Sequence, residues 1–376
     1  MTSNKITEIL EHNGIKFNFE AFHEKIIKEK EFQQSEIAFQ IKAKLEAEDS
    51  LNLDDTKDVI EALYKCSIYP KSLSFKFLSK HRTENDIYKL LLQYKNINQF
   101  LHLYRDKLKD QLGKDGRLHG KWSIDGAKTG RMTCCEPNLQ GFPNSMKEFF
   151  VPEDGNVFVI GDFSQIELRI LAEMSRESNM IRAFKEGRDI HAETAAFIFQ
   201  KDVSLIDDGA RGLGKKVNFS QCYGVSSYGL RKILKKQGIE ATLEQAEYIR
   251  GLFYKKYPNI YSFHNMLLIS DVIRSVGGRT WSDIPKGDGK RLNLPIQASA
   301  AEGFKQGLNF LIEDLMKNPT WKIVNVIHDE IVLEVPKSNV EEAKRVLENC
   351  MKKGMETMLK VVPVIVDMKI QNNWKK

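Results

Sequence analysis

The sequence has 376 residues, 41% of them hydrophobic and 29% charged. That length favours two or three subdomains with a sizeable core. Lysine and arginine outnumber aspartate and glutamate by 57 to 51, which gives a formal charge of +6 and suits a polyanionic partner without identifying one. No apolar run approaches the roughly 20 residues that cross a bilayer, and the amino terminus lacks a secretory pattern, so we expect an intracellular protein with no membrane partner.

The first ninety residues are rich in lysine and glutamate and have a mostly helical pattern, with Ile37, Ile41 and Leu45 spaced four apart. The turn-rich stretch 113–131, GKDGRLHGKWSIDGAKTGR, predicts a boundary after them. The five cysteines are an odd number without CxxC spacing. This argues against both a disulfide framework and a zinc site.

Residues 156–175 change period partway along. Their first part predicts a buried strand and their second part a helix, with Asp162 at the junction. A second helical block is predicted from about 177 to 275, where Thr242 begins a capping box and Pro258 interrupts the pattern.

The stretch 321–335, WKIVNVIHDEIVLEV, predicts a buried β-hairpin because two apolar runs rich in β-branched residues meet at an acidic bend. A helix over 298–316 precedes it, and the run VVPVIVDMKI predicts a closing strand.

Asp162 and Asp329 each end a strongly apolar run. Burying an ionised carboxylate without a partner is costly, so each needs one. A divalent cation such as Mg²⁺ would satisfy both, since it prefers oxygen ligands and completes its shell with water and phosphates. Two independent turn aspartates would give the same pattern.

Arg211, Lys215, Phe219 and Tyr223 recur every four positions and would form one stripe on a helix. The stripe passes from cations to aromatics, which is the order that a nucleoside triphosphate presents from phosphates to base. Asp207 or Asp208 could cap this helix. Gly212 and Gly214 inside it either allow close packing or leave its first turns easy to move, and the sequence does not decide between these roles.

Together these segments resemble the polymerase region of family A DNA polymerases over roughly residues 85 to 376. The resemblance rests on five segments in the family's order, namely TGRMTCCEPNLQGFP (129–143), GDFSQIELR (161–169), RGLGKKVNFSQCYG (211–224), NLPIQASAAEG (293–303) and HDE (328–330). It implies an α+β right-hand fold. The implied parts are a helical thumb (1–118), an antiparallel-sheet palm in two parts (119–178 and 286–376) and helical fingers (179–285).

The resemblance also implies a DNA-templated DNA polymerase that extends a primer with dNTPs. Asp162 and Asp329 would bind two Mg²⁺ ions, with Mn²⁺ as a substitute and the carbonyl of Phe163 as a further ligand. One ion would activate the primer 3′-hydroxyl, and the other would neutralise the leaving pyrophosphate. Glu330 would assist near the metals, although a solvated neighbour of the site is the alternative.

Further roles carry over for nucleotide and primer-template binding. Phe219 would pack on the deoxyribose, Tyr223 would occupy the template-base position until the helix closes, and Glu167 would exclude ribonucleotides. The remaining nucleotide contacts would come from Arg211, Lys215, His191 and Gln165. The primer-template contacts would come from Arg131, Asn138, Gln140, Asn293, Gln297 and His328.

The chain departs from the family's pattern at several positions. Phe219 in place of tyrosine predicts discrimination against dideoxynucleotides. Exonuclease motifs are not apparent in the residues before the TGR segment, so we expect no proofreading activity from this chain. We expect a cytoplasmic or organellar monomer, and the sequence does not identify a separate exonuclease or processivity factor.

Two other functions would fit part of the pattern. A single-subunit RNA polymerase shares the basic helix but lacks the SQIELR and HDE segments. A catalytically silent primer-template binding protein would not need Asp162, Asp329, Arg211 and Lys215 together.

Overall fold

The computed structural model describes residues 2–375, with side chains from Lys5 onward. It divides into a sheet unit (2–14, 120–142 and 152–373) and a helical unit (15–119, 143–151 and 374–375). Helix α1 (Thr2–Asn13) belongs to the sheet unit, not with the helices of the predicted 1–118 segment. The reason is its polar contacts: Asn13 Nδ2 donates to the Ile323 carbonyl (2.9 Å), and Glu11 accepts from the Trp122 amide (2.6 Å).

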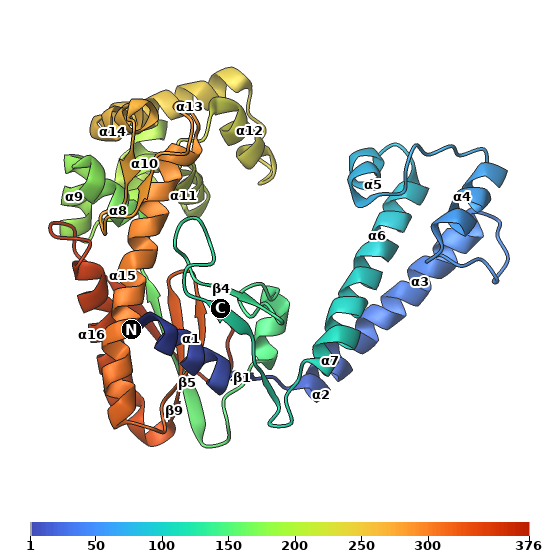
Figure 1. The fold of residues 1–376 in the computed structure, drawn as a ribbon. Helices are drawn as coiled ribbons and strands as arrows, with labels where there is room; N and C mark the ends of the chain where they lie inside the picture. The colour runs from blue at the N-terminus through green and yellow to red at the C-terminus, as the bar shows by residue number, and fades with distance from the viewer. Residues whose placement is uncertain (1, 376) are drawn as a thin grey trace. The chain divides into compact units, whose positions relative to one another are not determined.

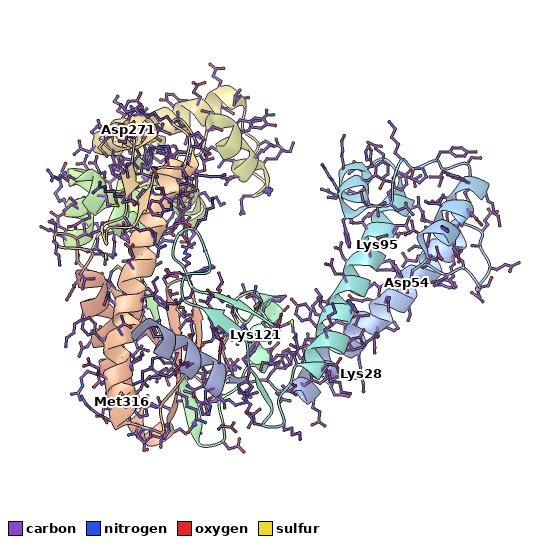
Figure 2. The ribbon with its side chains drawn as sticks, viewed as in Figure 1. Lys28, Asp54, Lys95, Lys121, Asp271 and Met316 are labelled. Carbon is purple, nitrogen blue, oxygen red and sulfur yellow. The ribbon has the colours of Figure 1, made fainter. Side chains whose placement is uncertain are left out.

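Four helices of the helical unit in Figure 1, α3 to α6, contribute apolar side chains to one hydrophobic core. Ile41 and Leu45 are buried in this core, as their spacing predicts. Asp54, labelled in Figure 2, accepts hydrogen bonds from Tyr94 Oη (3.3 Å) and Asn98 Nδ2 (2.5 Å), which joins the loop before one helix to the side of another. The elements are β1 (Ile15–Lys16), α2 (Phe19–Phe22), α3 (Lys28–Lys44), α4 (Thr56–Lys65), α5 (Phe75–His81), α6 (Asp86–Leu101), α7 (Leu108–Asp110) and β2 (Arg117–Leu118).

A four-stranded antiparallel sheet forms the centre of the sheet unit, in the order β10-β5-β9-β8. Its strands are β5 (Asn156–Phe163), β8 (Lys322–Ile327), β9 (Glu330–Pro336) and β10 (Val366–Gln371). The predicted strand, hairpin and closing strand are therefore confirmed. The hairpin turns at His328, whose φ of 52° lies in the left-handed region, and at Asp329.

Helices α15 (Lys290–Lys317) and α16 (Val340–Glu356) lie beside this sheet in Figure 1. They cross so closely that a Cβ on Gly354 would lie 2.1 Å from the Gly307 nitrogen, so only glycine fits there. Helix α15 begins eight residues earlier than the predicted start at 298 and contains Pro295.

The predicted helical block after β5 is confirmed as a series of shorter helices. Thr242 forms the expected capping box with Gln245, and Pro258 begins a new helix instead of only ending the previous one. These helices are α8 (Ile166–Ser175), α9 (Ser178–Lys185), α10 (Ile190–Phe199), α11 (Asp208–Cys222), α12 (Ser227–Lys235), α13 (Leu243–Lys256) and α14 (Pro258–Ile269). Two short antiparallel pairs complete the unit, β3 (Lys121–Ser123) with β4 (Thr133–Cys135) and β6 (Ile273–Arg274) with β7 (Thr280–Trp281).

All five cysteines are free thiols. Within residues 2–375, no helix combines the length and the apolar character that membrane crossing requires.

Candidate active site

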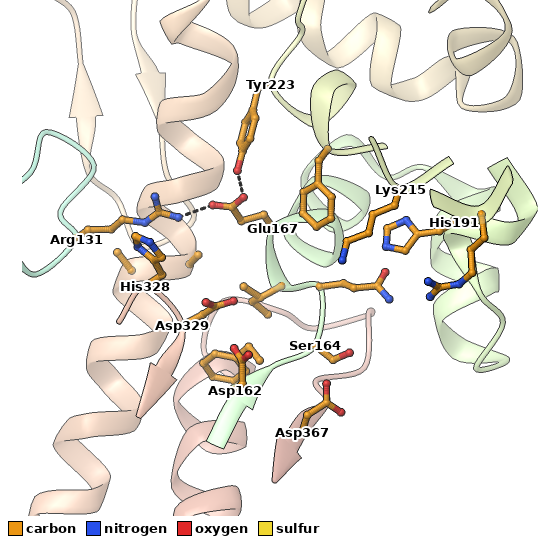
Figure 3. A pocket seen from close by; sticks show the side chains of 17 residues that line it. Arg131, Asp162, Ser164, Glu167, His191, Lys215, Tyr223, His328, Asp329 and Asp367 are labelled. Atoms are coloured by element: carbon orange, nitrogen blue, oxygen red, sulfur yellow. Dashed lines mark hydrogen bonds and ion pairs between the residues drawn. The ribbon is translucent and has the colours of Figure 1, made fainter. Parts of the chain in front are cut away.

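One end of the four-stranded sheet borders a cavity of about 560 Å³ (Figure 3). Asp162 near the end of β5, Asp329 in the β8–β9 turn and Asp367 at the start of β10 all line it. The antiparallel register explains why these distant residues meet, because Asp162 is paired with Glu330 on one side and with Asp367 on the other. The Phe163 amide also donates to the Asp329 carbonyl (3.3 Å), which fixes the turn against β5.

Glu330 is 3% exposed. The alternative that it is merely a solvated neighbour of the site is therefore wrong. Its place directly opposite Asp162 in the sheet accounts for the burial, since β9 lies between β5 and β8.

Helix α11 lines the cavity with the predicted stripe of Arg211, Lys215, Phe219 and Tyr223. Asp207 caps this helix by accepting a hydrogen bond from the Ala210 amide (2.7 Å). Cations and aromatics thus share one side of the helix, facing the same cavity as the aspartates.

Glu167 on α8 joins two of the predicted residues (Figure 3). It accepts from Arg131 Nη2 (2.6 Å) through one oxygen and from the Tyr223 hydroxyl through the other. Burial raises the pKa of Glu167, and the Arg131 guanidinium opposes that shift. The contacts hold Tyr223 at the rim of the cavity beside Glu167.

The cationic side of the cavity is organised by Asp189, the N-cap of α10. Arg211 Nε donates to its carboxylate at 2.5 Å, and the amides of His191 and Ala192 donate to the same group. Burial opposes ionisation of Asp189, but these hydrogen bonds outweigh it and lower its pKa. His191, labelled in Figure 3 near Lys215, lines the cavity although it is only 2% exposed.

The oxygen donors at the sheet end suit a hard divalent cation. Asp162, Asp329 and Phe163 line the cavity together, and the buried Gln165 Oε1 beside them has no hydrogen-bond partner among the described residues. Residues 2–375 hold no group of three or more histidine, cysteine or acidic side chains arranged for a metal ion. An ion bound here would therefore complete its shell with water and phosphate oxygens.

The predicted primer-template residues are only partly gathered at the cavity. Arg131 and His328 line it, and Gln297 Oε1 accepts from Arg131 Nη1 (3.4 Å). Gln140 lines an adjoining small cavity with Arg131 and His328 and donates to the Val326 carbonyl (3.1 Å). Asn138 and Asn293 line neither cavity.

Sequence reasoning missed several residues of the site, namely Ser164, Asp189, Asn218 and Asp367. Asp367 ends the apolar run of its strand, as Asp162 does, so the same signal was present. Asp189 precedes a helix and carries an N-cap signal.

Gly212 and Gly214 turn out to differ. A Cβ on Gly214 would lie 2.1 Å from the His191 carbonyl oxygen, whereas one on Gly212 would meet nothing within 4 Å. Close packing of α10 on α11 therefore explains Gly214, and it does not explain Gly212.

Comparisons with known proteins identify the family to which the chain belongs. The family model described as DNA polymerase family A matches residues 22–376. The chain is similar to DNA polymerase I of Aquifex aeolicus, with 36% identity over 298 residues that cover 77% of this chain and 51% of that protein. It is also similar to the thermostable DNA polymerase I of Thermus filiformis, with 31% identity over 314 residues that cover 78% of this chain and 37% of that protein.

The chain thus spans about half or less of the length of these relatives. A solved structure, the POL domain of Pol1 from M. smegmatis in complex with DNA primer-template and dNTP, has a similar fold. Its TM-score is 0.82 at 22% identity, covering 100% of this chain and 70% of that one. The predicted α+β polymerase fold is thereby confirmed. The chain belongs to DNA polymerase family A.

Proposed function

We propose that this chain is a DNA-templated DNA polymerase, which extends the 3′-hydroxyl of a primer with dNTPs by nucleotidyl transfer. One observation carries the proposal: the acidic end of the sheet and the cationic-to-aromatic stripe of α11 line the same cavity. Acidic oxygens on one side and cations on the other are what an in-line transfer between a hydroxyl and a triphosphate requires. Membership of the family and the primer-template and dNTP bound to the M. smegmatis neighbour support it.

Each group would have a role that follows from its charge and position. Asp162 and Asp329, with the carbonyl of Phe163, would hold two divalent ions, which when bound lower the pKa of the attacking hydroxyl and neutralise the leaving pyrophosphate. Arg211 and Lys215 would hold the triphosphate by charge-assisted hydrogen bonds.

The sugar and base would lie farther along α11. Phe219 is half-buried at the cavity and offers a flat apolar face to the deoxyribose. Tyr223, held at Glu167, would leave the template-base position when α11 closes. Glu167 would then stand where a ribose 2′-hydroxyl must fit.

The segments predicted as thumb, palm and fingers would divide the work. Basic side chains of the thumb (1–118) and of the two palm segments (119–178 and 286–376) would bind the primer-template. Duplex binding would therefore be salt-sensitive and largely independent of sequence. Residues 179–285 would carry the incoming nucleotide.

A primer-extension assay with Mg²⁺ tests the proposal. Asp329→Ala should abolish extension while leaving primer-template binding nearly unchanged, because binding rests on other residues. Asp154→Asn, a change of an exposed aspartate in the loop before β5, is the control and should extend normally. Extension that persists in Asp329→Ala would refute the assignment of this site.

The same assay with a mismatched primer tests the expected lack of proofreading. Release of the mismatched nucleotide by the wild-type chain and equally by Asp162→Asn would point to a separate nuclease site and overturn that expectation.

A further inference from the structure

His191 lies in the first turn of α10, in a position that leaves its ring little freedom. The residue is 2% exposed, and α10 packs on α11 so closely that a Cβ on Gly214 would strike the His191 carbonyl. The ring of Phe219 lies beside the imidazole, with centroids 5.8 Å apart. The imidazole ring is therefore packed against protein on one side and borders the cavity on the other.

The side chain of Asn218 on α11 determines which imidazole nitrogen carries the proton. Asn218 Nδ2 lies 3.2 Å from the Ile190 carbonyl oxygen and 3.0 Å from His191 Nδ1. A backbone carbonyl can only accept, so the amide nitrogen, not the amide oxygen, must face this pair. One of its hydrogens goes to Ile190 and the other to His191 Nδ1. Nδ1 must then accept, and a neutral His191 carries its single proton on Nε2.

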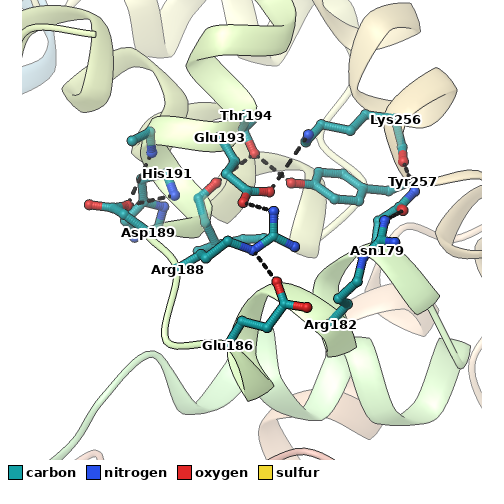
Figure 4. A network of polar contacts seen from close by, with 12 residues as sticks. Asn179, Arg182, Glu186, Arg188, Asp189, His191, Glu193, Thr194, Lys256 and Tyr257 are labelled. Carbon is teal, nitrogen blue, oxygen red and sulfur yellow. Dashed lines mark hydrogen bonds and ion pairs between the residues drawn. The ribbon is translucent and has the colours of Figure 1, made fainter. Parts of the chain in front are cut away.

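Two buried hydroxyls, those of Thr194 and Tyr257, lie at the other end of the Asn218 amide. Asn218 Oδ1 lies 2.9 Å from Thr194 Oγ1. Thr194 Oγ1 lies 2.8 Å from the Tyr257 hydroxyl (Figure 4). Asn218, Thr194 and Tyr257 are all fully buried. Burial raises the pKa of the Tyr257 hydroxyl, which therefore keeps its proton and can donate to Thr194. The single hydroxyl hydrogen of Thr194 has two acceptors, the Ile190 carbonyl oxygen at 2.8 Å and Asn218 Oδ1 at 2.9 Å.

The charges around His191 favour its neutral form. The pKa of His191 is lowered to about 4, mainly by burial; Asp189 opposes this shift, and Arg211 and Lys215 on α11 add to it. From α13, the Lys256 ammonium lies 3.8 Å from Glu193, which also pairs with Arg188 (Figure 4). At neutral pH the imidazole thus presents one N–H donor and no charge.

We propose, resting on the polymerase function above, that Asn218 is a positioning residue that holds His191 as the Nε2–H tautomer. His191 then serves the triphosphate as a neutral hydrogen-bond donor, not as a third cation beside Arg211 and Lys215. Thr194 and Tyr257 support Asn218 in this role. If these hydrogen bonds served only to hold α10 against α11, they would not affect how His191 binds the nucleotide.

The tautomer can be measured without any activity. Two-bond ¹H–¹⁵N spectra of the histidine-labelled chain at about pH 7.5, where an unperturbed imidazole is mostly neutral, report which nitrogen is protonated. The signals of His191 are assigned by their loss in His191→Gln. The expected result is the Nε2–H pattern. An Nδ1–H pattern or an imidazolium would overturn the proposal, whether or not the chain polymerises DNA.

Kinetics test the consequence. Asn218→Asp keeps the shape but replaces the donor facing Nδ1 by an acceptor, so Nδ1 must take the proton and Nε2 loses it. The KM for dNTP, relative to wild type at each pH, should rise roughly tenfold at high pH. The ratio of the variant's KM to the wild-type KM should decrease as the pH falls, because protonation to the imidazolium restores an N–H on Nε2. In a His191→Gln background, Asn218→Asp should have almost no further effect on this KM.

A constant KM ratio at every pH, or effects of the two substitutions that simply add, would show a purely structural role and overturn the proposal. If Asn218→Asp does not fold, the spectra still decide, since they need no change at Asn218. If the wild-type chain shows no primer extension at all, the polymerase function is refuted. The tautomer measured in the spectra would not be affected by that result.

Discussion

In the antiparallel pairing of β5 with β9, Asp162 lies directly opposite Glu330. On the other side of β5, Asp367 of β10 is its partner. Residues directly opposite each other in a sheet point to the same face, so three acidic side chains from three strands stand in one row. Like charges opposite each other destabilise a sheet by roughly 0.2–1 kcal/mol a pair, which a bound cation would reverse.

Asp162→Asn should therefore stabilise the chain in EDTA, by up to about 1 kcal/mol in the free energy of unfolding. Mg²⁺ should stabilise the wild type by binding the folded state, and it should stabilise the variant much less. Urea unfolding with and without Mg²⁺ measures both effects. Asp154→Asn, which changes an exposed aspartate away from the row, should respond to Mg²⁺ as wild type does. An equal response of Asp162→Asn would remove Asp162 from the cation site.

Sugar selection should depend on the Glu167 side chain. Glu167→Ala opens space at the cavity where a 2′-hydroxyl would fit, and we expect ribonucleotide incorporation relative to deoxyribonucleotide incorporation to rise roughly tenfold or more. Single-nucleotide incorporation opposite one template base measures the ratio.

Tyr223→Phe is the matched control, because it removes only the hydroxyl that donates to Glu167. Arg131 still holds the carboxylate at 2.6 Å, so selection should change far less. An unchanged ratio in Glu167→Ala would assign sugar selection to another residue.

Local patterns in the sequence predicted most of the helices and strands around the site. The change of period after Asn156 predicted β5 and α8, and the apolar runs around His328 predicted β8 and β9. The spacing of four from Arg211 predicted one face of α11, because helical geometry alone sets which side chains share a face. Periodicity is a local property of the sequence, so it predicts correctly those features that depend on a single helix or strand.

Tertiary contacts decided the rest. The pattern of residues 2–14 predicts a helix, but it does not predict that Asn13 donates to Ile323, the contact that joins α1 to the sheet unit. The predicted helix started at 298, yet α15 begins at Lys290 and runs through Pro295. Proline lacks the amide that would bond to the Arg291 carbonyl, and the packing of α15 outweighs that loss. Asn218 gave no signal because a buried amide acts through partners distant in sequence.

Buried His264 should make the chain sensitive to acid. Its Nδ1 lies 3.2 Å from the Tyr254 hydroxyl, but its buried Nε2 has no hydrogen-bond partner among the described residues. Burial lowers the pKa of His264 from 6.5 to about 4. The folded state therefore binds fewer protons than the unfolded state between these pH values, so stability is present above about pH 6.5 and is lost as the pH falls toward 4.

His264→Phe should remove this dependence and an unsatisfied polar atom. We expect a gain of about 1 kcal/mol at neutral pH. The gain should grow by up to about 1.4 kcal/mol for each pH unit below the normal imidazole pKa. Urea midpoints across the acidic range measure it. His12→Phe, at an exposed histidine, should show no such growth. A gain independent of pH would mean that the pKa of His264 is the same in the folded and unfolded states.

Gly212 and Gly214 form a natural matched pair on α11. Gly214→Ala would press its Cβ against the His191 carbonyl and should lower the free energy of unfolding by roughly 1–3 kcal/mol. Gly212→Ala meets nothing within 4 Å and should raise it by up to about 1 kcal/mol through helix propensity. Urea unfolding of the two variants tests the opposite signs.

The rate of nucleotide incorporation then reveals why Gly212 is present at all. If α11 must rotate onto the nucleotide, stiffening its first turns with Gly212→Ala should slow single-turnover incorporation while the KM for dNTP stays near wild type. Gly214→Ala should instead raise that KM, because it displaces His191 from the cavity. A Gly212→Ala variant that is more stable and incorporates nucleotides at the wild-type rate would show that closure does not depend on flexibility at this position.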